Sequence, residues 1–418
     1  MWTNAGTHTW YIPQGVTKVF AFVIGAGGGG YAYNDYYASK IFQGGKGGGY
    51  AHGVISGLTP GNTITVTVGL GGKGYSRNIS GSGSAGGNSS FGSYLTGNGG
   101  GAGAELSSDN GDQRGQGGSA STSGVTEAYT AAGGGGGRWF QTTDQDSTLN
   151  DGRGQHGGGS SGSPFGPGNG PQRVQGSACT TGGAGWAHGQ TWDGNFGYGN
   201  VMSRLSPHKL ALPGDGSHYQ ISGQGLITFE SDANEPTANG APTQGGYGLT
   251  SRGGYSWSDG NGGVSVGGQN NTGKWASGMM TGAMDGEDKP WWFPWEVDGG
   301  GGGAVRMESQ SGMEGCLMTA GSGGSGAGGG AMMGNVYNRG ISFIGGKGGF
   351  GGGGGGCRAA RGHWNNKPSV MHGGQGGIGG GGGAAWTHKS WTTTSYSNDT
   401  NRSAYGGHGG NGCVCVYW

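Results

Sequence analysis

Apolar and β-branched residues gather at the two ends of the chain, and their pattern predicts β-strands there. Thr7–Ile12 and Lys18–Ile24 are rich in such residues, and Pro13-Gln14-Gly15 between them predicts a turn. The last residues, Cys413–Trp418, alternate and favour a strand as well. Further strands are predicted at Gly49–Ser56, Thr63–Val68 and Ser89–Thr96. We therefore expect the first and last segments to lie in one sheet system.

Glycine dominates the pattern between these ends. The chain holds 116 glycines in 418 residues, against a usual share of about 7 %. No segment carries the 3.6-residue apolar stripe of a helix, so almost no α-helix is expected. The runs are Gly44–Gly49, Gly133–Gly137, Gly299–Gly303, Gly321–Gly330, Gly345–Gly356, Gly373–Gly383 and Gly406–Gly412.

The other residues within these runs recur at every third position. Examples are Lys347 with Phe350, Gln375 with Ile378, and His408 with Asn411. A polyproline-II-type helix has three residues per turn, so residues three apart point the same way. Residues three apart thus form a column along the helix, and there are three such columns. One column bears side chains, and the other two present only backbone. Such a helix has no internal hydrogen bonds, and buried backbone groups need partners, so the spacing predicts a bundle of glycine helices.

Gly345–Gly356 is the richest run, and we expect it to form the central rod of this bundle. At about 3.1 Å per residue it would be about 37 Å long. A bulky side chain at Gly352 or Gly353 should then unfold the domain, whereas a linker would tolerate it. The structural glycine core is assigned to Gly345, Gly351, Gly352, Gly353, Gly376 and Gly380.

A flexible linker, collagen and a phosphate-binding loop each fit the glycine content less well than a bundle does. A flexible linker would not need the period of three. Collagen needs glycine at every third place with abundant proline, and the chain has 12 prolines. A phosphate-binding loop at Val23–Gly30 lacks the following helix and the acidic residue about 20 positions on.

Charge and cysteine content narrow the function classes. The chain has 22 basic and 22 acidic residues, so nothing favours nucleic acid or an anionic membrane. No window resembles a signal peptide or a membrane span, so no membrane insertion is expected. The five cysteines argue against a disulfide framework and fit production in a reducing cytosol. Cys413 and Cys415 are expected on one face of a strand as buried thiols.

No catalytic or metal-binding motif is present, so neither an enzyme nor a bound cofactor or metal is expected. Carboxylates such as Asp285, Glu287 and Asp288 suggest glycan hydrolysis only weakly, because solvated loop charges account for them as well. The ten histidines are dispersed and favour polar loop contacts.

Aromatic clusters provide the strongest binding signal. Large rigid rings beside Asn, Ser and Gly give contact area at low entropic cost. Two interpretations stay open: the rings contact a ligand, or they cover the ends of the glycine bundle and contact other subunits. The candidate receptor-binding residues are Tyr31, Tyr33, Tyr36, Tyr37, Trp139, Phe140, Trp291, Trp292, Phe293, Trp295, Trp364, Trp386 and Trp391.

Several motifs together resemble a known family. They are Thr9–Val19 followed by Gly25–Gly30, then Gly48-Gly49-Tyr50-Ala51, Leu58-Thr59-Pro60-Gly61, Ile64–Gly69, Ser89-Ser90-Phe91-Gly92 and Gly409-Gly410-Asn411-Gly412. This pattern is similar to the glycine-rich tail-fibre and tip adhesins of phages. The resemblance implies a β-sandwich-like frame that encloses polyglycine-II helices, with loops at one tip that contact the host surface.

The resulting expectation is a mostly β protein with three parts that intertwine. Residues 1–100 would form a β frame with the first glycine runs, 101–405 the glycine lattice with long loops, and 406–418 the closing strand. The expected function is that of a virion-associated adhesin, made in the host cytoplasm, that binds a cell-surface protein or glycan. Other virion or fibre proteins and a homo-oligomer, such as a trimer, are the further expected partners. The alternative is a structural virion protein, a fibre shaft or capsid decoration.

Overall fold

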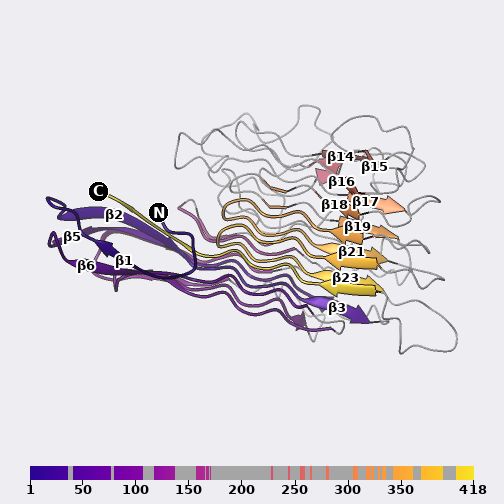
Figure 1. The fold of residues 1–418 in the computed structure, drawn as a ribbon, viewed down its shortest axis with the longest axis horizontal. Coiled ribbons are helices and arrows are strands. Elements are labelled where there is room, and N and C mark those ends of the chain that lie inside the picture. Colours follow the sequence, from indigo (N-terminus) through magenta and orange to yellow (C-terminus); the bar gives the residue numbers. More distant parts are fainter. Residues whose placement is uncertain are drawn as a thin grey trace.

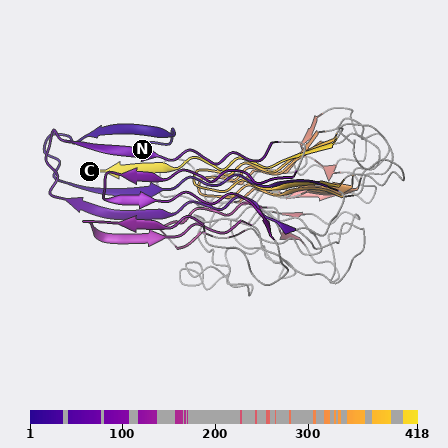
Figure 2. The same ribbon diagram turned by 90° about the horizontal axis from the view of Figure 1, so that it is seen from below.

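The structure is a computed structural model of the chain. It describes residues 1–35, 41–76, 80–106, 117–136, 157–164, 166–168, 342–360, 369–388 and 402–418, together with shorter pieces between 170 and 335. In these residues the regular structure is β, and no α-helix occurs. Figures 1 and 2 show a β-sandwich at one end, strands at the other, and extended glycine segments running lengthwise between them.

Two antiparallel sheets form the sandwich, which we call the frame. In the first sheet the order is β1-β6-β7-β8-β10, and in the second it is β11-β5-β2-β25. The first comprises β1 (Gly6–Tyr11), β6 (Thr63–Val68), β7 (Ser89–Phe91), β8 (Leu95–Gly97) and β10 (Ala120–Thr122). The second comprises β11 (Thr126–Ala131), β5 (Tyr50–Ser56), β2 (Lys18–Ile24) and β25 (Cys413–Tyr417).

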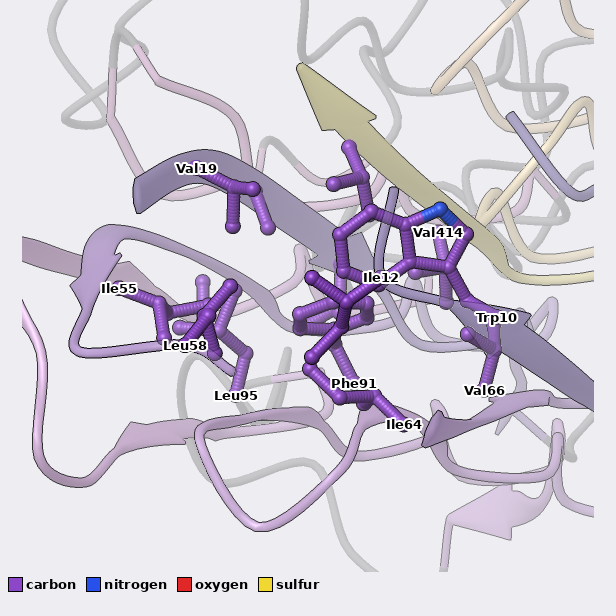
Figure 3. Packing of buried hydrophobic residues seen from close by; sticks show 14 of the residues in the cluster. Trp10, Ile12, Val19, Ile55, Leu58, Ile64, Val66, Phe91, Leu95 and Val414 are labelled. Atoms are coloured by element: carbon purple, nitrogen blue, oxygen red, sulfur yellow. The ribbon is translucent and has the colours of Figure 1, made fainter. Parts of the chain in front are cut away.

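The core of the frame lies between these sheets. Alternate residues of the strands face inward, as expected for two packed sheets. Trp10 and Phe91 from the first sheet have ring centroids 5.6 Å apart. The cluster draws residues from both sheets, and Figure 3 shows Trp10, Ile12, Val19, Ile55, Leu58, Ile64, Val66, Phe91, Leu95 and Val414.

The predicted strands of the frame are confirmed, with two differences. Ser89–Thr96 is expected as one strand, but Gly92 has φ +52° and turns the chain between β7 and β8. The frame also takes β10 and β11 from residues beyond 100, the expected limit of the N-terminal part. The first and last segments do meet, since β25 pairs with β2 and Trp2 bridges to Val414.

Glycine segments pass from the frame to the far end and bond to one another through their backbones. In segment 25–32, the N–H groups of Gly25, Gly28 and Tyr31 donate to segment 43–49. Those of Ala26, Gly29 and Ala32 donate to segment 81–87, and those of Gly27 and Gly30 to segment 407–410. Each neighbour therefore receives every third N–H group, which confirms that the segments bond with a period of three.

The same period explains which positions carry side chains. In segment 373–377 the N–H groups of residues 373, 374, 376 and 377 donate to neighbouring segments. Gln375, between them, is exposed, and its N–H has no backbone partner in the described part of the chain. His408 has the same position in segment 406–412. In these two segments the side chains of Gln375 and His408 thus occur in the column that faces solvent, and glycine fills the positions that donate to other segments.

The expectation that Gly345–Gly356 forms one rod is wrong. The chain reverses at Phe350-Gly351, where Gly351 has φ +75° and Gly352 N–H donates to Gly349 O. A second reversal lies at Ile378-Gly379, where Gly379 has φ +72°. Both halves of each run are enclosed, and residues 351–356 are all buried as expected.

The central segment is instead 379–384. The N–H groups of Gly380–Gly383 and that of Ala385 donate to segments 373–377, 157–163 and 25–32. Its carbonyl groups accept from segments 43–49, 352–357 and 406–412. A segment that has a different neighbour on each of its sides can pair its backbone N–H and C=O groups with these neighbours, so that the groups need no hydrogen bonds to water.

At the far end the segments continue into two sheets of parallel strands. One has the order β16-β18-β20-β22-β24, the other β17-β19-β21-β23-β3. The first comprises β16 (Met279–Thr281), β18 (Leu317–Thr319), β20 (Ser342–Ile344), β22 (Ser369–His372) and β24 (Arg402–Tyr405). The second comprises β17 (Val305–Glu308), β19 (Met332–Asn335), β21 (Cys357–Ala360), β23 (Ala385–His388) and β3 (Ala32–Asp35).

The remaining strands form two small antiparallel sheets. They are β4 (Ile41–Phe42) with β9 (Glu105–Leu106), and β12 (Ile227–Thr228), β13 (Thr243–Gln244), β14 (Tyr255–Ser258) and β15 (Val264–Ser265).

Candidate functional site at the far end of the glycine bundle

The end of the molecule opposite the frame is built from strand ends held in a fixed order. β19, β21, β23 and β3 run away from the frame and end there, as Figure 1 shows for all four. β20, β22 and β24 begin there and lead back into glycine segments. Each glycine hairpin therefore adds one strand to each parallel sheet.

Small and apolar side chains fill the space between the two parallel sheets. The thiol of Cys357 in β21 lies 3.4 Å from the carbonyl oxygen of Phe343 in β20, so the sheets are in direct contact. Residues fully buried in these strands are Ala32, Met332, Phe343, Cys357, Met371, Ala385 and Ala404. The strand ends are therefore supported by a packed layer as well as by the glycine segments behind them.

Three of the candidate receptor-binding residues are in the described part of the chain, and all three are buried. Tyr31 is 4 % exposed, Tyr33 1 % and Trp386 4 %. Tyr33 and Trp386 are in register on the adjacent parallel strands β3 and β23. A ring this enclosed offers almost no contact area to a receptor, so burial favours the second interpretation, in which these rings cover the end of the bundle.

Tyr31 also forms a defined polar contact. Its hydroxyl donates to Oε2 of Glu105 at 3.0 Å. Burial raises the pKa of Tyr31, and the bond to the Glu105 carboxylate raises it further. The phenol therefore stays protonated and keeps donating over the physiological pH range, which ties segment 25–32 to the end of segment 97–105.

The other candidate residues lie outside the described residues. Trp364 and Trp391 belong to the segments that join β21 to β22 and β23 to β24. Tyr36 and Tyr37 follow β3, and Trp291, Trp292, Phe293 and Trp295 lie between β16 and β17 in the sequence. Trp139 and Phe140 follow the glycine run that ends at Gly137.

The assigned glycine core lies where it leaves no room for a side chain. A Cβ at Gly353 would overlap the carbonyl group of Gly158, and one at Gly380 that of Gly352. At Gly376 it would overlap the carbonyl of Gly380, and at Gly345 that of Gly355. Gly351 is needed for its positive φ at the reversal, where Gly352 makes the closing hydrogen bond. The methyl group of alanine would therefore push segments apart at the first four positions.

A set of polar side chains that the sequence did not single out closes one border of the bundle. Side chains of neighbouring segments accept several N–H groups of segment 69–75. Asn411 Oδ1 accepts from Gly71 at 3.0 Å, and His408 Nδ1 accepts from Gly74 at 3.1 Å. Ser84 and Ser89 accept from Lys73 and Gly69 in the same way. The period of three at His408 and Asn411 was the available signal for this role.

One further pair of rings lies on the outer side of the parallel strands. His372 in β22 and Tyr405 in β24 are in register and stack, with ring centroids 4.8 Å apart and planes 15° from parallel. Burial lowers the pKa of His372, so its ring is neutral near pH 7. The stack adds a cross-strand contact between β22 and β24, where these strands pass into glycine segments 373–377 and 406–412.

Among the described residues, no helix is long and apolar enough to cross a bilayer. The same residues hold no group of three or more His, Cys, Asp or Glu suited to a metal ion.

Comparison with known families places the chain. A family model described as a glycine-rich domain matches residues 3–264. The chain belongs to the glycine-rich domain family. For this glycine-rich domain protein, the match covers every frame strand except β25, together with the first glycine segments. No curated protein matches the chain.

Proposed function

We propose that this glycine-rich domain protein is a virion-associated adhesin at the tip of a phage tail fibre. In this proposal it is made in the host cytoplasm and acts outside the cell, where it binds a surface protein or glycan. The observation that carries the proposal is the ordered row of strand ends at the far end of the bundle. Trp364 and Trp391 follow β21 and β23 in the sequence, and in this proposal a receptor contacts several such segments at once.

In the same proposal the glycine segments form a polyglycine-II lattice that acts as a rigid support. The period of three in the backbone hydrogen bonds supports this conformation, because it is the period of a polyproline-II-type helix. Close backbone contacts at Gly353 and Gly380 support the rigidity. A support of this kind lowers the entropic cost of binding, since the contact residues start from fixed positions.

The second candidate is a structural virion protein, a fibre shaft or capsid decoration whose loops contact other subunits. Burial of Tyr31, Tyr33 and Trp386 favours it, because rings used as covers need no external ligand. Under either candidate other virion proteins are partners, and the adhesin also binds the host receptor; we propose no catalytic, cofactor-dependent, nucleic-acid-binding or membrane-inserting role.

Adsorption of the assembled particle separates the two candidates. Particles that carry Trp291→Ala, Trp292→Ala and Trp295→Ala together should assemble normally and adsorb poorly to the host. A matched control is Thr9→Ala with Thr65→Ala, which removes exposed side chains from the frame at the other end. Normal adsorption of the tryptophan variant would refute the assigned contact residues, and failed assembly would favour the structural candidate.

A further inference from the structure

One edge of the frame lacks the features that usually protect the edge of a sheet. β25 (Cys413–Tyr417) is the last strand of its sheet, and it contains no charged residue, proline or bulge. Natural edge strands are commonly blunted by such features, because their free backbone groups can pair with another chain. At the opposite edge, β11 has a bulge between Thr126 and Tyr129 and an exposed Glu127.

The hydrogen bonds of β25 show where its outer edge is free. Val414 exchanges both of its backbone bonds with Trp2, at 2.8 and 3.0 Å. Its N–H and C=O groups therefore point away from β2. The backbone N–H and C=O groups of successive residues in a strand point to alternate sides, so those of Val416 also point outward, away from β2. In the described part of the chain, Trp2 covers the edge at Val414 and no strand covers it at Val416.

Large apolar side chains are exposed at both ends of this free edge. Trp418 is 67 % exposed, and its ring centroid lies 5.6 Å from that of buried Trp10. Met1, next to Trp2, is 72 % exposed. Together with the free backbone groups, these residues form a surface that could gain both hydrogen bonds and apolar burial from an added strand.

We propose that β25 pairs with β25 of a second copy of this chain, antiparallel and about a two-fold axis near Tyr417. The axis lies there because Trp2 occupies the edge at Val414, so Val416 of each copy would pair opposite Trp418 of the other. The two four-stranded sheets then become one continuous sheet. Such a two-fold contact uses the same surface patch on both copies.

A second copy fits this edge better than a charged partner does. No charged residue of Cys413–Trp418 would face its equivalent across the axis, where like charges opposite each other destabilise a sheet. The net charge of the whole chain is +0, so two copies do not repel at long range. The contact is a dimer, in contrast to the expected trimer, and it does not depend on the adhesin function.

Sedimentation of the full chain with charge variants tests the pairing. The wild-type chain should reach twice its 41.4 kDa mass as concentration rises. Trp418→Glu and Trp418→Lys should each dissociate at least about tenfold more readily, because like charges meet near the axis. An equimolar mixture of the two variants should recover the dimer, since opposite charges then meet. Tyr11→Glu, at an equally exposed aromatic on β1, is the control and should leave the dimer intact.

Three results would overturn the proposal. The first is a wild-type chain that stays monomeric at all concentrations. The second is a dimer that the Trp418 variants leave unchanged, or that Tyr11→Glu dissociates instead. The third is a mixture of Trp418→Glu and Trp418→Lys that stays monomeric although each variant keeps the wild-type unfolding transition. The Glu and Lys side chains at position 418 would then not meet across an axis.

Discussion

Gly382→Ala is the sharpest perturbation of the glycine bundle, because it adds a single methyl group to the central segment. The Cβ would overlap the carbonyl group of Gly407 in the neighbouring segment. Gly382 itself donates to Gly28 O at 2.9 Å, and its carbonyl accepts from Gly45 at 2.8 Å. To admit the methyl group, segment 379–384 must move away from segment 406–412 and disturb bonds on several sides.

The cost can be estimated from this geometry. Overpacking a tight interior costs about 1–3 kcal/mol. Each buried backbone group left without a partner costs about 1–3 kcal/mol more. Loss of one or two such bonds gives a total of about 4 kcal/mol, a large part of the roughly 5–15 kcal/mol by which a domain is stable. The variant should therefore unfold at a much lower urea concentration than the wild-type chain.

Gly101→Ala is the matched control for this experiment. It lies in a similar glycine segment, but its Cβ would meet only the Lys46 side chain, at 3.5 and 3.9 Å. Since alanine also reduces the entropy of the unfolded chain, the effect should lie within about 1 kcal/mol of the wild-type chain. Urea unfolding followed by circular dichroism measures both variants. Equal stability of Gly382→Ala and Gly101→Ala would refute the close packing of the glycine segments.

The border of the bundle, the half-buried His52 and His372, and the buried Cys413 thiol each give a further prediction. Asn411→Ala should lower the free energy of unfolding by about 1–2 kcal/mol, because it leaves the N–H of Gly71 without its acceptor. Gln375→Ala, at an exposed position, is the control and should cost little. Equal effects of the two variants in urea unfolding would contradict the capping role of Asn411. Burial lowers the pKa of both His52 and His372, so these histidines bind protons more readily in the unfolded chain than in the folded one. The free energy of unfolding should therefore fall as the pH drops through about 6.5. The double variant His52→Gln with His372→Gln should lose less stability over this pH range. Burial raises the pKa of the Cys413 thiol to about 12, so iodoacetamide should label Cys413 only in the unfolded chain, and labelling of the folded chain would contradict its enclosure.

The frame was predictable from the sequence because its strands are long enough to show their pattern. Lys18–Ile24 and Thr63–Val68 have the bounds that their residues indicated. Their turns also contain recognisable residues, such as Gly61 with φ +85°. The period of three likewise identified Gln375 and His408 as positions that face solvent, because a Cβ at the glycines beside them would overlap a neighbouring segment.

The reversals and the parallel sheets could not be predicted in the same way. Gly351 and Gly379 turn the chain, but within a run of glycines nothing distinguishes a residue with positive φ from its neighbours. Strands such as Ser342–Ile344 are too short to show alternation. Their partners are set by the register of the glycine segments behind them, and this register depends on contacts between distant parts of the chain.

The sequence singled out aromatic residues by their type, but it could not indicate which of them are buried. Tyr33 and Trp386 stand out as aromatic residues beside glycine runs, but the sequence could not indicate that adjacent parallel strands bury them. The capping role of His408 and Asn411 could not be predicted, because it depends on which segment lies beside them. That segment, 69–75, is far away in the sequence: Gly71 and Asn411 are 340 residues apart.

Amide hydrogen exchange along the glycine segments tests the central claim, that glycine builds a bonded bundle with a period of three. In segments 373–377 and 406–412, the amides of residues 373, 374, 376, 377, 406, 407, 409, 410 and 412 donate to other segments. They should exchange slowly, while those of Gln375 and His408 exchange fast. Uniformly fast exchange would mean that the segments are linkers, and uniformly slow exchange would contradict the solvent-facing column.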